Sequence, residues 1–190
     1  QGRELELQAR PVRDLDLAAS ISYLDATYDS FVTPYGTCTV ANAALDPRCV
    51  GRAGLPRLID AGGNRLNNAP EWKGTVSAGY GIDLASGGRV SLFAQLSYQD
   101  RVFFLPANTT VMSQGAYTLL DARVAYATEG GALEVAAFGK NLGDEEYFHN
   151  IVQFTSTSDA RRDPFSIGNA LGYPAPGRQW GVELTYRFGR

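Results

Sequence analysis

The sequence is poor in residues that titrate or coordinate metals, and it contains no long apolar stretch. Histidine and methionine occur once each among 190 residues, cysteine occurs twice, and charged residues make up 19% of the chain. Soluble domains usually carry about 25% charged residues. No stretch approaches the roughly 18 consecutive apolar residues of a spanning helix. This leaves a soluble fold or a closed β-barrel, in which paired strands satisfy each other's backbone groups.

Positive charge is scarce as well, with a net charge of -3 and no cluster of lysines. A nucleic-acid partner is therefore not expected, because neutralising phosphates requires a basic surface. Glycine, tyrosine and phenylalanine are plentiful instead, with 21, 10 and 9 copies. This composition favours β-structure over helix.

Alternation of apolar with polar or small residues predicts β-strands, because successive strand side chains point to opposite faces. In the final such segment, Trp180, Val182 and Leu184 alternate with small or polar residues. Seven segments follow this pattern, the first and sixth less regularly: residues 4–9, 15–23, 72–80, 90–99, 120–126, 133–142 and 180–188. We therefore predict seven strands, each with one apolar face.

The connections between these strands alternate between short and long. Short turns rich in Pro, Gly, Asp and Ser are expected at residues 11–14, 83–88 and 128–131. Long loops are expected at residues 29–70, 101–115 and 144–174, far beyond the usual connection of about 4 to 6 residues. Short turns on one rim and long loops on the other are typical of outer-membrane barrels. The predicted fold is thus all-β, an antiparallel transmembrane β-barrel segment with short periplasmic turns and long extracellular loops.

Aromatic residues at strand ends fit the same interpretation, because their rings suit the two membrane–water interfaces. Ordinary core packing is the alternative role. The residues expected at the interfaces are Trp72, Tyr80, Tyr98, Tyr117, Tyr126, Trp180, Tyr186 and Phe188.

Five motifs, in order along the chain, resemble the C-terminal part of TonB-dependent receptors. They are Gly2-x-Glu4-x-Glu6, the segment 68–72 (Asn-Ala-Pro-Glu-Trp), the segment 117–123 (Tyr-Thr-Leu-Leu-Asp-Ala-Arg), the segment 139–147 (Gly-Lys-Asn-Leu-Gly-Asp-Glu-Glu-Tyr), and Pro176-Gly177-Arg178 with the strand to Phe188. The resemblance covers essentially the whole chain, residues 1–190. It implies a receptor with an N-terminal plug and a barrel of 22 strands, of which these would be the last seven.

The resemblance also implies a function: capture of a scarce nutrient by the outer loops and import energised by the periplasmic TonB complex. Outer-membrane lipid, the plug, the other barrel strands and a small-molecule or metal-chelate ligand are the expected partners. A ferric siderophore, a corrinoid and an oligosaccharide all remain open as ligands. The plug and the TonB-contacting segment would lie before Gln1, so we expect the chain to be part of a longer protein whose unpaired edges need further strands.

Ligand contacts, if this part of the receptor makes them, should come from the long loops. Aromatic side chains there could provide apolar surface, and Arg161 and Arg162 could pair with an anionic ligand. Packing of the loops on themselves is the alternative. The loop aromatics are Tyr28, Phe31, Tyr35, Phe103, Phe104, Phe148, Phe154, Phe165 and Tyr173.

The two cysteines, Cys38 and Cys49, lie in the longest loop, which would face an oxidising exterior. A disulfide is expected there, with two free thiols as the alternative, and it would stabilise the loop by about 3 kcal/mol.

We predict no catalytic, cofactor or metal site. His149 follows three acidic residues, but no serine lies at a same-face spacing from it, although Ser156 and Ser158 occur nearby. We expect Asn141 and Asp144 instead to hydrogen-bond the local backbone where the strand ends.

Two other classes compete with a transport receptor. A small barrel serving as an adhesin or anchor would need an even number of strands, and therefore one more within residues 29–70, where Val32 and Leu58-Ile59 are poor material. An outer-membrane hydrolase would need the serine–histidine pair that the spacing does not supply.

Overall fold

The computed structural model describes residues 1–33, 49–50, 58–154 and 169–188, and every structural statement below concerns these residues. Within them, no helix combines the length and apolar character needed to cross a bilayer. The only helical elements described are two single 3-10 turns, η1 (Thr110–Met112) and η2 (Glu129–Gly131).

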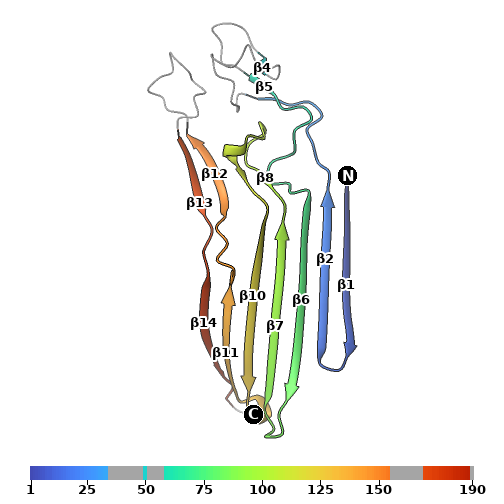
Figure 1. Cartoon of the computed structure of the whole chain (residues 1–190), viewed down its shortest axis with the longest axis vertical. Coiled ribbons are helices and arrows are strands. Elements are labelled where there is room, and N and C mark those ends of the chain that lie inside the picture. Colours follow the sequence, from blue (N-terminus) through green and yellow to red (C-terminus); the bar gives the residue numbers. More distant parts are fainter. Residues whose placement is uncertain (34–48, 51–57, 155–168, 189–190) are drawn as a thin grey trace.

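Seven long strands form one antiparallel sheet, called the wall here, in the order β1-β2-β6-β7-β10-β11-β14 (Figure 1). The strands are β1 (Gly2–Val12), β2 (Leu15–Leu24), β6 (Trp72–Asp83), β7 (Arg89–Gln99), β10 (Tyr117–Ala127), β11 (Leu133–Lys140) and β14 (Gln179–Tyr186). All seven predicted strands are confirmed, with ends that differ by a few residues. Each pairs with its neighbour along the chain, as in an up-and-down barrel.

Three smaller sheets lie beyond the wall, at its loop end. They are β3 (Val32–Thr33), β5 (Leu58–Asp60) and β4 (Cys49–Val50) in one sheet; β8 (Val102–Phe103) with β9 (Ser113–Gln114); and the hairpin of β12 (Phe148–Phe154) with β13 (Asn169–Pro174). Val32 and Leu58-Ile59 thus do form strands. These strands are only two or three residues long and belong to a separate sheet, so they add nothing to the wall.

The opposite end of the wall is closed by the three predicted tight turns (Figure 1). Asp14 has a φ of 65° between β1 and β2, Gly87 has a φ of 84° between β6 and β7, and Gly130 and Gly131 have φ values of 72° and 68° between β10 and β11. Glycine and, less often, aspartate adopt this left-handed conformation at low cost. These residues therefore let each strand reverse within a few positions.

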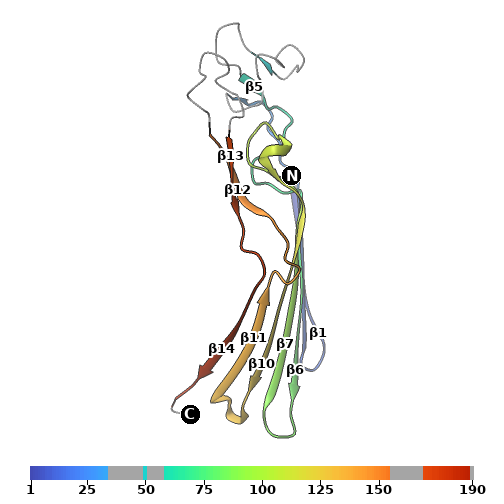
Figure 2. The ribbon, with the colours of Figure 1, turned by 60° about the vertical axis from the view of Figure 1, so that its left-hand side comes forward.

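The strand register separates an apolar face from a polar face. One row across the apolar face runs Leu7, Ala19, Val76, Leu96 and Leu120, each paired with the next. The large side chains of this face are exposed, as Val76 at 59% and Leu96 at 48% illustrate. A soluble sandwich would cover such a face with a second layer. Figure 2 shows instead a wall one sheet thick.

The aromatics of the apolar face gather toward its two ends. Near the loops lie Trp72, Tyr98 and Trp180, with Tyr23 packed 4.7 Å from Trp72 between ring centroids. Toward the turns lie Tyr80, Tyr126 and Tyr186, with Phe188 4.5 Å beyond Tyr186 and edge-on to it. The described side chains therefore form two aromatic bands separated by aliphatic residues.

Tyr117, which was expected at an interface with the other strand-end aromatics, does not belong to the apolar face. Tyr117 pairs with Gln99, which also pairs with Lys73, so all three belong to the polar face. A strand end alone does not fix the direction of a side chain, because one residue of offset moves it to the other face.

Candidate functional site

The first two long loops are joined by reciprocal hydrogen bonds at Asn108 and Arg65. The Arg65 backbone N–H donates to Oδ1 of Asn108 at 2.8 Å, and Nδ2 of Asn108 donates to the Arg65 carbonyl at 3.0 Å. Asn108 holds a φ of 52°, a conformation that asparagine tolerates better than most residues. One side chain thus satisfies both backbone groups of a residue in the other loop.

Three further hydrogen bonds continue this contact. The side chain of Asn64 donates to the Pro106 carbonyl at 2.7 Å, and that of Asn67 donates to the Phe104 carbonyl at 3.1 Å. The backbone N–H of Asn68 donates to the Phe103 carbonyl at 3.0 Å. We call these contacting segments, residues 64–68 and 103–108, the loop clamp.

Buried side chains accompany the loop clamp, whereas the wall has few. Ala61, Met112, Val102 and Phe104 are between 0% and 7% exposed. Most of the described buried apolar residues therefore lie in the loops. Arg65 adds an ion pair with Glu71 and approaches Asp100 at 3.8 Å, tying the clamp to the strand ends.

The third long connection begins with an asparagine turn. Asn141 has a φ of 49°, its Nδ2 donates to the Glu145 carbonyl and its Oδ1 accepts from the Glu145 N–H, each at 2.9 Å. Asp144 accepts a hydrogen bond from the Arg178 N–H at 2.8 Å. The prediction that these side chains bond the local backbone is confirmed for Asn141, whereas the Asp144 side chain bonds the backbone of Arg178, which is distant in the chain. These contacts join the two ends from which β12 and β13 extend.

This connection contacts β9 through a hydrogen bond and β10 through an aromatic stack. The Phe148 N–H donates to Oε1 of Gln114 at 2.8 Å, and the Tyr147 ring stacks on Tyr117 with centroids 4.3 Å apart. His149 packs edge-on against Tyr147 at 5.5 Å. His149 therefore serves as an aromatic neighbour in this structure, and no described group of three or more His, Cys, Asp or Glu side chains could hold a metal ion.

The turn end of the polar face is crossed by ion pairs. Arg89 bonds Asp14 at 2.6 Å and also Asp83, joining the first two turns. Arg123 bonds Glu134 at 2.8 Å and approaches Glu183 at 3.7 Å. The hydrogen bond from Arg89 lowers the pKa of Asp14 below its ordinary range, the Arg89 charge acting in the same direction and desolvation opposing both.

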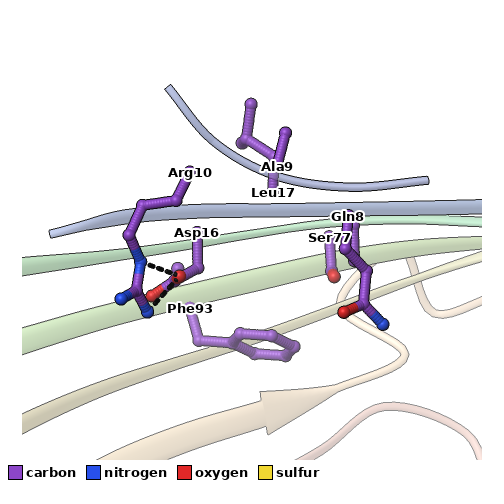
Figure 3. A pocket seen from close by; sticks show the side chains of 9 residues that line it. Gln8, Ala9, Arg10, Asp16, Leu17, Ser77 and Phe93 are labelled. Atoms are coloured by element: carbon purple, nitrogen blue, oxygen red, sulfur yellow. Dashed lines mark hydrogen bonds and ion pairs between the residues drawn. The ribbon is translucent and has the colours of Figure 1, made fainter. Parts of the chain in front are cut away.

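A hollow of about 580 Å³ lies on this face where β1, β2, β6 and β7 run side by side (Figure 3). The Arg10–Asp16 ion pair, at 2.6 Å, stands at one end, and Gln8 and Ser77 stand at the other. The Phe93 ring lies below them and is 43% exposed. The hollow thus combines a neutralised ion pair with an uncovered aromatic ring.

A sequence model of the family described as TonB dependent receptor-like, beta-barrel, matches residues 1–142, about three quarters of the chain. The chain belongs to the TonB-dependent receptor family. The strand order, the single-layer wall and the long-loop rim are those expected of a segment of such a barrel. The wall is therefore a partial antiparallel transmembrane barrel, with its apolar face toward lipid.

Solved TonB-dependent receptors share this fold. The ferric yersiniabactin uptake receptor FyuA of Yersinia pestis superimposes with a TM-score of 0.65 at 14% identity, covering 95% of this chain and 22% of that one. The siderophore receptor PiuA of Acinetobacter baumannii gives 0.61 at 21% identity, covering 96% of this chain and 21% of that one. BauA, the ferric preacinetobactin receptor of the same species, gives 0.56 at 16% identity, covering 97% and 22%. The chain thus spans about a fifth of the length of these receptors.

Six of the eleven loop residues named above as possible ligand contacts have described side chains: Tyr28, Phe31, Phe103, Phe104, Phe148 and Tyr173. Phe103 is half-buried, and Phe104 is 7% exposed inside the loop region. Tyr35, Arg161 and Arg162 lie outside the described residues, and of Phe154 only the backbone is described. Contact of these residues with a ligand stays a prediction. For Phe104, as for the stacked pair Tyr28 and Phe31 at 4.9 Å, the position fits packing of the loops on themselves.

The predicted disulfide also stays a prediction. Cys38 lies outside the described residues, and of Cys49 only its backbone in β4 is described.

The loop clamp and the paired arginines are the features that sequence analysis missed. Four asparagines at positions 64, 67, 68 and 108 were the available signal. Their partners lie about forty residues away in the chain. The loop clamp therefore forms only when the folded wall brings the ends of the two loops together.

Proposed function

We propose that this chain forms part of the wall and outer loops of a receptor in the bacterial outer membrane that imports a scarce nutrient, such as a ferric siderophore, with energy delivered through TonB. In the complete barrel of 22 strands, these would be the last seven. The polar face would line the lumen and contact the N-terminal plug. The outer loops would receive a small-molecule or metal-chelate ligand.

The observation that carries this proposal is the family match together with an exposed apolar face that ends in two aromatic bands. Lipid is the environment in which such a face is stable. The fold is shared with FyuA, a ferric yersiniabactin uptake receptor, with the siderophore receptor PiuA and with the ferric preacinetobactin receptor BauA, and this supports a siderophore as the leading ligand class.

The two alternatives gain no support from the described residues. A small adhesin or anchor barrel needs an even strand number, whereas the described wall has seven strands and the short strands β3, β4 and β5 pair elsewhere. A hydrolase needs a serine beside His149, and the nearby Ser156 and Ser158 lie outside the described residues. The family consists of transporters rather than enzymes, and we propose that this chain carries out no bond-making chemistry.

Uptake of radiolabelled iron by the full-length receptor tests the proposal. In a host deprived of iron and lacking its own siderophore receptors, expression of the full-length receptor should enable import of at least one ferric chelate. Deletion of TonB should abolish this import. Import unchanged by TonB deletion, or binding of host surfaces without any import, would contradict the proposal.

A further inference from the structure

The loop end of the polar face contains a second hollow, of about 410 Å³. It lies where β2, β6, β7 and β10 approach the outer loops, at the opposite end of the face from the Arg89 and Arg123 ion pairs. Its polar lining comes mainly from Ser20, Ser22, Lys73, Thr75, Gln99 and Tyr117. Volumes of this order accommodate a small ligand or one arm of a larger one.

Four of these residues form one line across four strands. Ser22 pairs with Lys73, Lys73 with Gln99, and Gln99 with Tyr117. Neighbouring strands are about 4.8 Å apart, so side chains that carry a hydroxyl, an ammonium, an amide and a phenol group leave the sheet at regular intervals across the hollow. Ser20 and Thr75, in the next row, are hydrogen-bonded to each other at 2.7 Å.

Lys73 differs from the paired arginines of the chain in having no described partner. Arg10, Arg65, Arg89, Arg123, Arg178 and Arg187 each form an ion pair. Among the described groups, none forms an ion pair or side-chain hydrogen bond with the Lys73 ammonium, and this side chain is exposed. Glu4 also lines the hollow, but it stands two strands away on β1 and forms no ion pair with Lys73. Lys73 therefore has no ion-pair partner among the described side chains, and Glu4, which shares its row through Ser22, is the one carboxylate of the lining.

Tyr117 supplies a flat wall at the other side of Gln99. Its ring is held by the stack on Tyr147 at 4.3 Å and 21° between planes. A cation and a fixed aromatic ring thus flank one amide. Together they suit a ligand that carries both a negatively charged oxygen and a planar or apolar portion.

We propose that this hollow binds an anionic oxygen group of the transported ligand, a carboxylate or phenolate of a metal chelate, with Lys73 as its charge partner. Ser22, Gln99 and Tyr117 flank that group with hydrogen-bonding side chains. The inference rests on the proposed transport function and narrows the ligand from chelates in general to anionic ones.

The test compares Lys73→Gln and Lys73→Arg in the full-length receptor, with ferric citrate, a ferric catecholate and a neutral ferric trihydroxamate as probes. Lys73→Gln should weaken binding of at least one anionic probe by about tenfold, the usual effect of a lost charge-assisted hydrogen bond. Lys73→Arg should retain most of the affinity. The neutral probe should show no such difference.

Lys140→Gln is the matched control, because Lys140 is the only other lysine and is also exposed, but does not line the hollow. It should bind every probe as the wild type does. The inference is overturned if Lys73→Gln keeps wild-type affinity for the anionic probes, if Lys140→Gln loses as much, or if the wild type binds only the neutral chelate. If one of these results is obtained but the wild-type receptor still imports a probe, only the inference about Lys73 fails and the transport function is retained. If the wild type imports none of the probes, the transport function and the inference about Lys73 both fail.

Discussion

Arginine and asparagine side chains have separate roles in this protein. The arginines of the polar face neutralise carboxylates on neighbouring strands, as Arg123 does with Glu134. The asparagines bond backbone groups in the loops, as Asn108 does with Arg65. An asparagine amide can donate and accept at once, whereas a guanidinium only donates. Irregular loop backbone leaves both N–H donors and C=O acceptors without partners in a sheet. Asparagine can satisfy both kinds of group, which explains its use in these loops.

At Asp14, the ion pair with Arg89 makes stability depend on pH. Asp14→Asn should lower the free energy of unfolding near neutral pH, and asparagine tolerates the φ of 65° that the turn requires. Because the folded-state pKa of Asp14 is lowered, the carboxylate's contribution is complete above its unfolded-state pKa and is lost as pH falls through the folded value.

Urea unfolding of full-length protein in detergent, repeated from neutral to strongly acidic pH, checks this expectation. The gap between wild type and variant should close in acid. A gap of constant size at every pH would show that the Asp14 charge contributes nothing.

At Asn108, loss of the side chain should loosen the loop clamp. Asn108→Gly removes both hydrogen bonds to Arg65 and two longer ones to the Leu105 and Pro106 carbonyls while still permitting the φ of 52°, and Asn108→Ala adds backbone strain. We expect a local cost of about 1 to 3 kcal/mol for the glycine variant and a larger one for alanine. Hydrogen exchange should speed up at the amides of residues 64–68 and 103–108 while the wall strands stay protected. Unchanged exchange in both variants would mean that the clamp does not depend on Asn108.

At the scale of elements, each wall strand carries two surfaces with different requirements. Leu96 and Gln95 are neighbours on β7, yet Leu96 belongs to the exposed apolar face and Gln95 pairs with Ser77 and Asp121 on the polar face. Apolar and polar side chains therefore alternate along the strand, as a barrel wall between lipid and lumen requires.

Paired arginine substitutions on β7 test this orientation. Leu96→Arg should destabilise the folded barrel by about 2 kcal/mol, because Leu96 lies between mid-membrane, where a cation on the lipid face costs about 2 to 4 kcal/mol, and the aromatic band at Tyr98, where the cost is smaller. Gln95→Arg should be tolerated, because its side chain would enter a hydrated lumen. Folding of the full-length receptor into lipid vesicles under a urea gradient measures both. Equal costs would mean that the two faces have been assigned incorrectly.

The sequence predicted the wall well because alternation is a local signal, readable within ten residues of each strand. Tyr117 shows where strand-end position misleads: it lies three residues from Leu120 on the same strand, so the alternation itself turns it to the polar face, and its pairing with Gln99 agrees. The Asn108–Arg65 contact could not be predicted, because it joins loops whose approach depends on four strands pairing first. The short strand Leu58–Asp60 was missed as well, since three residues carry too little pattern.

At the scale of the whole molecule, the described chain lacks the interior that a soluble domain would have. The wall is one layer, its described edge strands are β1 and β14, and Trp180 and Val182 on β14 are 82% and 72% exposed. Backbone groups left unpaired within lipid are costly. Partner strands at both edges are therefore needed for a stable wall.

Residues 1–190 expressed alone should consequently fail to form a heat-resistant, membrane-inserted monomer. We expect aggregation or association with further copies, visible as the absence of a heat-modifiable band on cold gel electrophoresis. The full-length receptor is the positive control. A stable inserted monomer of the fragment would refute the need for additional strands.

The loop clamp has a mechanical consequence for the wall. One of its loops springs from β2 and β6 and the other from β7 and β10, so the outer ends of four adjacent strands are fastened to one another. The rim above these four strands should therefore resist widening, because spreading their outer ends apart would have to break the hydrogen bonds of the loop clamp.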